Sequence, residues 1–138
     1  MYDLNQKTFG ENSAGAAHSL RGLAHVYQMK PDFPKAEETL LRALKIYETI
    51  YGPDDSRTAI PWTSLCYVYD QWGKADKSAP CHAHLVSMAE KQFGPDSPYV
   101  IRDLTAEAQA LRELGRTEEA VKLEQRMQTI QAAQSNPN

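Results

Sequence analysis

Apolar and polar positions along the chain recur at intervals of three and four residues, the spacing of amphipathic helices. Five segments with this pattern predict helices at about 13–29, 33–50, 75–92, 98–114 and 117–133. A sixth helix follows the capping residues Asp55 and Ser56 and ends at Gly73, and Pro61 either delays its start or bends its first turns. The sequence shows no strand-like alternation that competes with them. We therefore expect an all-α fold.

Within each pair of helices, one stripe of each helix is apolar. The first helix carries a stripe that we expect to be buried, made of Ala17, Leu20, Leu23, Ala24 and Tyr27. The second helix carries the matching stripe Ala36, Leu40, Ala43, Leu44 and Tyr47. Two antiparallel helices packed along these stripes are the expected unit.

A short junction motif recurs every 42 residues. Tyr51-Gly52-Pro53-Asp54 matches Phe93-Gly94-Pro95-Asp96, and Phe9-Gly10 is its shorter relative. The glycine can end a helix in the left-handed conformation, and the polar residues after it can cap the next helix. The chain thus divides into a remnant at 1–9, three repeats at 10–51, 52–93 and 94–134, and a tail at 135–138.

The two ends of the array differ from its middle. Met1–Thr8 aligns with the last turns of the later helices, so we expect the chain to begin inside a truncated helix left from a preceding hairpin. At the other end, Glu107 replaces the leucines at 23 and 65, and Glu124 replaces Leu40. These substitutions predict a last repeat adapted to water, as terminal repeats need to be.

These residues resemble the tetratricopeptide repeat. The match comprises Leu20, Leu23, Ala24, Tyr27, Ala36, Leu40, Ala43, Trp62, Leu65, Tyr69 and Gly73. The 42-residue period and the aromatic-Gly-Pro-Asp junction are similar to the kinesin-light-chain type of this repeat. The resemblance implies a right-handed α-solenoid of three hairpins whose first helices line a concave wall.

Residues on that wall are the candidate binding site. Carried over from the family, they are His18, Arg21, His25, Gln28, Ile60, Thr63, Tyr67, Asp70, Gln71, Arg102, Thr105, Gln109 and Arg112. Arginine forks suit carboxylates, which favours an acidic peptide, and Tyr67 is the expected apolar anchor. The Lys and Asn clamp with which some family members hold a chaperone tail is absent.

Composition narrows the class of partner. Fifteen Lys and Arg against eighteen Asp and Glu give a net charge of −3, which does not favour nucleic acid. The chain has no apolar run long enough to span a bilayer and no signal-peptide pattern at its start, so we expect no membrane partner. Two cysteines are too few for a disulfide framework, so a reducing, cytoplasmic location is the default. A periplasmic or secreted location stays open, because residues upstream of Met1 would decide it.

Cysteine and histidine side chains cluster at Cys81, His82 and His84, with Cys66 on the facing helix. Successive helical residues point about 100° apart, so these side chains do not converge as a tetrahedral zinc site requires. We expect no metal, no cofactor and no catalytic site, with both cysteines as small core residues. The expected function is a scaffold that binds a peptide in the groove. The alternative is a structural module that forms homo-oligomers through its exposed repeat ends.

Overall fold

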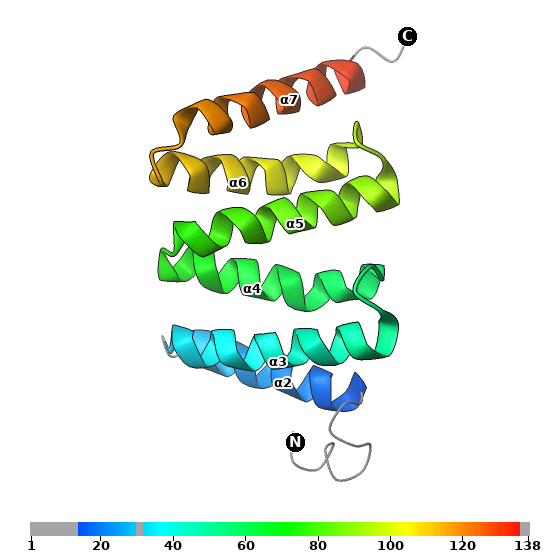
Figure 1. Cartoon of the computed structure of the whole chain (residues 1–138), viewed down its shortest axis with the longest axis vertical. Coiled ribbons are helices and arrows are strands. Elements are labelled where there is room, and N and C mark those ends of the chain that lie inside the picture. Colours follow the sequence, from blue (N-terminus) through cyan, green and yellow to red (C-terminus); the bar gives the residue numbers. More distant parts are fainter. Residues whose placement is uncertain (1–13, 30–31, 136–138) are drawn as a thin grey trace. The chain divides into compact units, whose positions relative to one another are not determined.

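Helices account for all regular secondary structure in the part of the chain that the structure describes. This computed structural model describes residues 14–29 and 32–135, and within the first range the side chains of residues 14, 16, 17, 27 and 28 are left out. The helices in Figure 1 are α2 (Ala14–Met29), α3 (Phe33–Tyr51), α4 (Ala59–Trp72), α5 (Ala75–Phe93), α6 (Ile101–Glu113) and α7 (Thr117–Ser135). The all-α prediction is confirmed, and the predicted bounds agree closely. The helix expected over residues 1–8 lies outside the described residues.

Short 3-10 helices precede two of the α-helices and were not predicted. They are η1 (Ser56–Thr58) before α4 and η2 (Pro98–Val100) before α6. Because of η1, α4 begins only at Ala59, so the buried Pro61 falls in its first turn, where a missing N–H costs little. Pro80, in contrast, lies inside α5.

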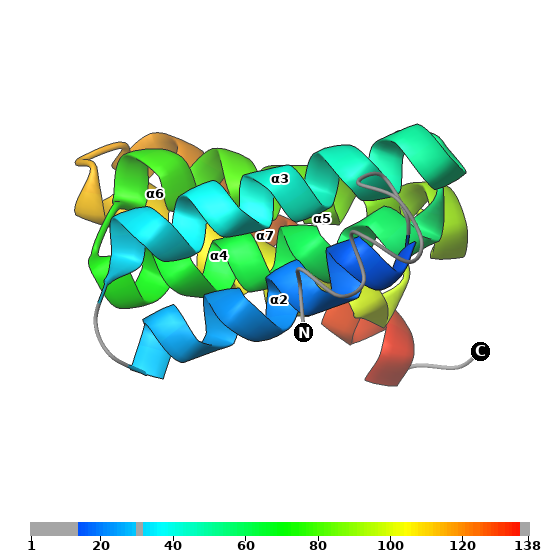
Figure 2. The ribbon, with the colours of Figure 1, turned by 90° about the horizontal axis from the view of Figure 1, so that it is seen from below.

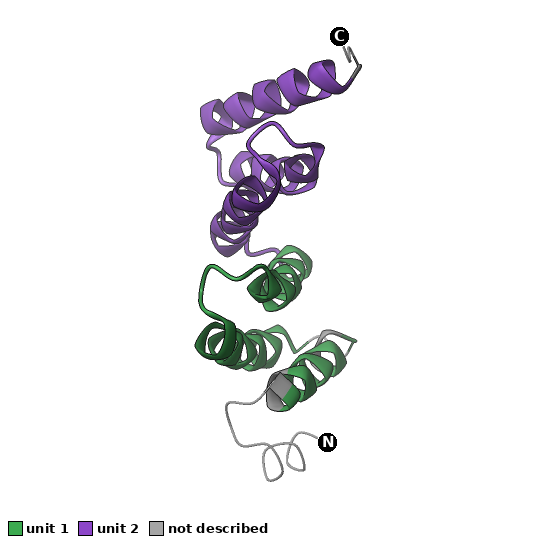
Figure 3. Ribbon diagram, turned by 90° about the vertical axis from the view of Figure 1, so that its right-hand side faces the viewer, with its two compact units in different colours: residues 1–72 green, residues 73–138 purple. Residues whose placement is uncertain are grey.

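Two compact units divide the chain, at residues 1–72 and 73–138 (Figure 3). The first unit contains α2, α3 and α4, and the second contains α5, α6 and α7. Each unit is therefore three consecutive helices, and in each the middle helix packs against both of the others.

In the first unit, α3 lies alongside α2 (Figures 1 and 2). Leu20 of α2 packs with Ala43, Ile46 and Tyr47 of α3, and all four are buried. The other predicted core residues of α3, Ala36, Leu40 and Leu44, are buried as well. Each fully buried large aliphatic side chain contributes about 1.5–3 kcal/mol, so this stripe holds the helix pair together.

The predicted burial of Leu23 is wrong. Its side chain is 36% exposed, although Leu20 and Ala24 on the same helix are each 1% exposed. Leu23 lies about 100° around α2 from Ala24 and about 60° from Leu20, so it falls at the edge of the face that packs against α3. Tyr27 and Ala17, also expected in this stripe, lie outside the described side chains.

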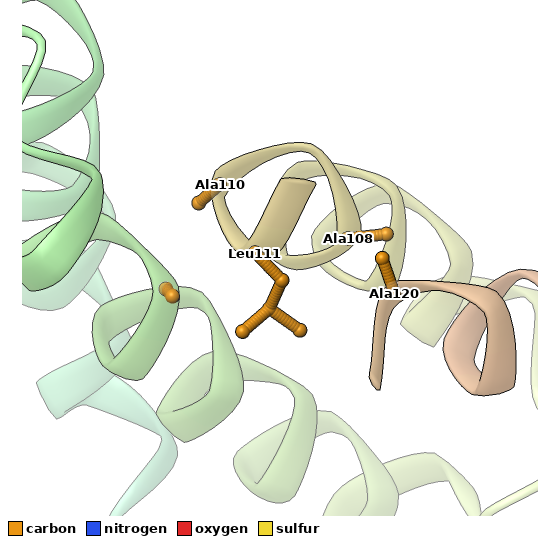
Figure 4. Close-up of a cluster of buried hydrophobic side chains, with 5 residues drawn as sticks. Ala108, Ala110, Leu111 and Ala120 are labelled. Carbon is orange, nitrogen blue, oxygen red and sulfur yellow. The ribbon is translucent and has the colours of Figure 1, made fainter. Parts of the chain in front are cut away.

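In the second unit, α6 packs between α5 and α7. Ala79 of α5, Ala108, Ala110 and Leu111 of α6, and Ala120 of α7 form one buried cluster (Figure 4). Val86, Val100, Leu104 and Ile130 form a second. The alanines of the first cluster allow close approach of the helix backbones, whereas the second cluster consists of larger aliphatic side chains.

The junction glycines turn the chain in a conformation that side chains rarely adopt. Gly52 has φ 93° and ψ 149°, and Gly94 has φ 97° and ψ 155°. The positive φ was expected, but ψ lies far from the left-handed helical value, so the predicted helix-ending conformation is wrong in this respect. Only glycine adopts this region readily.

The junction after α3 is further fixed by polar contacts. Asp55 accepts hydrogen bonds from the backbone N–H and from Nε of Arg57, each at 2.9 Å. These bonds lower the pKa of Asp55 to about 2. The Arg57 guanidinium also lies 3.8 Å from the centre of the Tyr51 ring. In the next junction, Ser97 is the capping residue and accepts from the Tyr99 N–H at 3.2 Å.

Glycine-to-alanine substitutions should separate these roles. We expect Gly52→Ala and Gly94→Ala to lower the free energy of unfolding by about 1–3 kcal/mol, because alanine is strained at their φ and ψ. Gly22→Ala, inside α2 where φ is negative, should raise it by about 0.5–1 kcal/mol. Urea titration followed by circular dichroism measures all three. Equal effects at Gly22 and Gly52 would contradict the backbone explanation.

Candidate functional site

The exposed face of α4 holds the central part of the predicted site. Ile60 and Tyr67 are 40% and 54% exposed, and Thr63 lies between them on the same face. Asp70 and Gln71, one turn further, are exposed too. Leu65, Val68 and Tyr69 of α4 are buried, so the helix is packed on one side while Ile60 and Tyr67 stay exposed.

Helix α2, which also contacts α4, holds the cationic part of the site in the first unit. His18 and His25 are exposed, whereas Arg21 is half-buried and its Nε is enclosed without a hydrogen-bond partner. Arg21 makes no ion pair with any residue that the structure describes. The side chain of Gln28, also predicted here, lies outside the described residues.

The second unit presents the remaining predicted residues on α6. These are Arg102, Thr105, Gln109 and Arg112, all exposed and spaced three and four residues apart. The Thr105 hydroxyl donates to the Ile101 carbonyl at 2.8 Å and lies 3.1 Å from Sδ of Met127. Arg102 has no ion-pair partner among the described residues.

Arg112 differs from the other two arginines because it is already paired. Its Nε donates to the Glu124 carboxylate at 3.0 Å, and Nη2 donates to the second oxygen of the same carboxylate. This forked contact lowers the pKa of Glu124. The sequence predicted Glu124 as a substitution adapted to water and Arg112 as a residue of the concave wall suited to a ligand carboxylate; the structure pairs the two.

Comparison with known proteins identifies the family to which this fold belongs. A tetratricopeptide repeat family model matches residues 16–91, which is more than half of the chain. This chain belongs to the tetratricopeptide repeat family. A search of the curated proteins found no match.

Solved structures show the same fold. BtubC (BKLC) from P. vanneervenii is 19% identical, with a TM-score of 0.81 over 98% of this chain and 56% of that one. A Podosopora anserina protein assigned as a kinesin light chain, with nearly identical TPR-like repeats, is 19% identical with a TM-score of 0.77, over 99% of this chain and 64% of that one. This chain therefore spans less than two thirds of either protein. The predicted likeness to the kinesin-light-chain type is confirmed at the level of fold.

The tetratricopeptide repeats of this chain also contain a buried polar pair that the sequence pattern did not predict. Nδ1 of His82 in α5 lies 2.9 Å from Oδ1 of Asp103 in α6, and the His82 side chain is 9% exposed. In the first unit, the repeat position of His82 is occupied by Leu40, which is 1% exposed. The His82–Asp103 pair therefore supplies a directed polar contact at a position where the first unit has an apolar side chain.

Glu107 lies half-buried in the same region of α6. Burial raises the pKa of its carboxyl group, and the nearby charges of His82 and Arg126 offset part of that rise. The prediction that Glu107 is a water-adapted substitution is therefore wrong in part, because its carboxylate is partly removed from solvent.

Among the described residues, the structure shows neither a cluster suited to a metal ion nor a free cysteine thiol. The described residues contain no group of three or more His, Cys, Asp or Glu side chains that could hold a metal ion. Cys66 and Cys81 are buried as predicted, but neither is a free thiol, so they give no argument for a reducing compartment. Among the described helices, none is both long and apolar enough to cross a membrane.

Glu107→Gln should test the burial of this carboxylate. Since its folded-state pKa lies above the ordinary value of 4.5, Glu107 stabilises the fold below pH 4.5, and this contribution is lost as the pH rises through the folded pKa. We expect the variant to be more stable than the parent at pH 7 and to lose that advantage near pH 4. Thermal unfolding at the two pH values checks this, and a gain of equal size at both would contradict it.

Proposed function

We propose that this tetratricopeptide repeat protein is a scaffold whose exposed α4 face binds an acidic peptide segment of a partner protein. Tetratricopeptide repeats generally mediate protein–protein interaction, and proteins of this fold are typically non-catalytic. The observation that carries the finer proposal is the outward exposure of Tyr67 and Ile60 on a helix whose other face is fixed in the core. An aromatic side chain held rigidly at a surface loses little entropy on binding.

Charge supports the acidic preference. Arg21 on α2 lies in the same unit as Tyr67 and has no ion-pair partner among the described residues. A ligand carboxylate can therefore pair with it without breaking an existing ion pair. Arg102 on α6 offers the same chemistry in the second unit. Arg112 contributes less to the proposal, because a ligand would first have to displace Glu124.

The affinity of such a site is modest. Each exposed arginine–carboxylate pair adds about 0.2–1 kcal/mol and is screened by salt. One well-placed aromatic anchor adds roughly 1–2 kcal/mol. We therefore expect dissociation constants in the micromolar range or weaker, with tighter binding at low salt.

Peptide binding tests the proposal. Fluorescence anisotropy should show that acidic helical or extended peptides bind more tightly than basic peptides of equal length, with a difference that shrinks in high salt. Tyr67→Ala should weaken binding about 5- to 30-fold. Arg21→Glu, in the same unit as Tyr67, should weaken it about two- to fivefold through the reversed charge.

Lys45→Glu is the matched control for the charge change, because Lys45 is exposed on α3, outside the proposed face. We expect it to change binding no more than the overall charge of the chain requires. If Tyr67→Ala leaves binding unchanged, or acidic and basic peptides bind alike, the proposal fails.

A further inference from the structure

The junction between α5 and α6 (Figure 1) presents two aromatic side chains to solvent. Phe93, the last residue of α5, is 49% exposed, and Tyr99 of η2 is 67% exposed. Their ring centroids lie 4.5 Å apart, and the ring planes are inclined by 33°. The two rings therefore lie against each other, while Tyr99 keeps most of its surface in solvent. Single exposed apolar residues need no explanation, whereas two adjoining rings form a patch on which a partner can dock.

The same turn joins the helices one repeat earlier, between α3 and η1. There, the backbone N–H of Asp55 donates to the Gly52 carbonyl at 3.2 Å. In the later junction, the N–H of Ser97 donates to the Gly94 carbonyl at 3.3 Å. The two junctions thus share one backbone geometry, so the side chains at equivalent positions can be compared directly.

A cation covers the aromatic residue of the earlier junction. The guanidinium of Arg57 lies 3.8 Å from the centre of the Tyr51 ring and donates two hydrogen bonds of 2.9 Å to the Asp55 carboxylate. A π face and a carboxylate both attract a cation, and here they hold the same one. Forty-two residues on, Phe93 takes the place of Tyr51. Tyr99 takes the place of Arg57, so the later junction has a second ring where the earlier one has a cation.

The surroundings of the two rings favour a cation supplied from outside. Asp96 lies in the turn between them, is exposed and has no ion-pair partner among the described residues. Helix α5 is 19 residues long and ends at Phe93, so its terminal carbonyl groups add partial negative charge at the junction. The nearby cations are already engaged, because Arg126 pairs with Glu90 at 3.1 Å and Lys91 takes part in another interaction.

The backbone that carries the two rings is held in place on both sides of the turn. Nη2 of Arg126 donates to the Pro95 carbonyl at 2.9 Å and so ties the turn to α7. Val100, directly after Tyr99, is buried in one cluster with Ile130 of α7. A ligand therefore does not have to order this backbone when it binds.

We propose that Phe93, Asp96 and Tyr99 form a contact surface that binds an arginine side chain from a basic segment of a partner protein. The guanidinium stacks on the exposed ring of Tyr99 and pairs with the Asp96 carboxylate, as Arg57 does with a ring and a carboxylate in the earlier junction. Arginine suits this surface better than lysine, because its planar group stacks on rings and donates a fork of hydrogen bonds. The surface belongs to the second unit and takes a ligand of the opposite charge, so this inference is independent of the peptide-binding proposal.

An NMR titration with a short capped peptide, acetyl-Gly-Arg-Gly-amide, tests the proposal directly. Its control peptide contains citrulline in place of arginine, which keeps the planar shape and removes the charge. We expect the arginine peptide to shift the ring resonances of Phe93 and Tyr99 with a dissociation constant of roughly 5–20 mM, since two exposed contacts bind weakly. The citrulline peptide should shift them at least roughly threefold less at equal concentration. Equal shifts from the two peptides would overturn the proposal.

Variants separate the ring from the carboxylate. Tyr99→Phe keeps the aromatic face and should bind the arginine peptide as the parent does, whereas Tyr99→Leu should weaken binding about three- to fivefold. Asp96→Asn should weaken it about two- to fivefold. Glu38→Gln is the matched control for the lost charge, because Glu38 is exposed on α3, and it should leave binding unchanged.

Melting temperatures of the same variants distinguish binding from a structural role. If Tyr99 only closes the junction by stacking on Phe93, Tyr99→Leu lowers the melting temperature and leaves binding of the arginine peptide unchanged. That result would overturn the proposal. So would a loss of binding in Glu38→Gln as large as that in Asp96→Asn, because the effect would then come from the overall charge of the chain.

Discussion

In each unit the middle helix, α3 or α6, buries two faces, and the rest of the unit depends on this constraint. α3 packs against both α2 and α4, and α6 packs against both α5 and α7, so each middle helix buries side chains on two faces. Ala43 and Ala108, both almost fully buried, have small side chains that allow the helix backbones to approach closely. Stability in such an array is largely a sum of nearest-neighbour contacts, because most of the packing joins adjacent helices, with a smaller contact between α2 and α4.

The two units meet this constraint with different chemistry. In the first unit, Leu40 and Leu65 fill the interior with apolar volume. In the second, the equivalents of these residues are His82 and Glu107, and the interface gains the His82–Asp103 contact. A buried polar contact adds little net stability but specifies alignment, since a shift of one helix would leave both groups unpaired. The second unit therefore loses some apolar stabilisation at these positions and gains a contact that fixes the alignment of α5 with α6.

The sequence predicts the helices well because the three- and four-residue period and the junction glycines are local signals. It predicts the α3 core correctly for the same reason: Leu40, Ala43 and Tyr47 are buried as their spacing indicates. It fails at Leu23, where burial depends on a neighbouring helix and not on the residue. It also misses the pairing of Arg112 with Glu124, because a contact between residues on two helices requires their packing to be known. For the candidate site, the sequence predicted which side chains are exposed, but it did not predict which arginine is already in an ion pair.

Helix α4 shows how such a chain separates binding from folding. Leu65 and Val68 are buried while Tyr67, between them, is 54% exposed, so adjacent residues serve the core and the surface. A substitution at Tyr67 removes little buried area and should leave the fold intact, whereas one at Leu65 leaves a cavity costing about 2–5 kcal/mol. The exposed positions can therefore vary with the partner while the buried ones stay fixed by packing. This separation also explains why the fold could be read from the sequence more fully than the ligand: the period reports the buried positions, and the partner is recognised by the others.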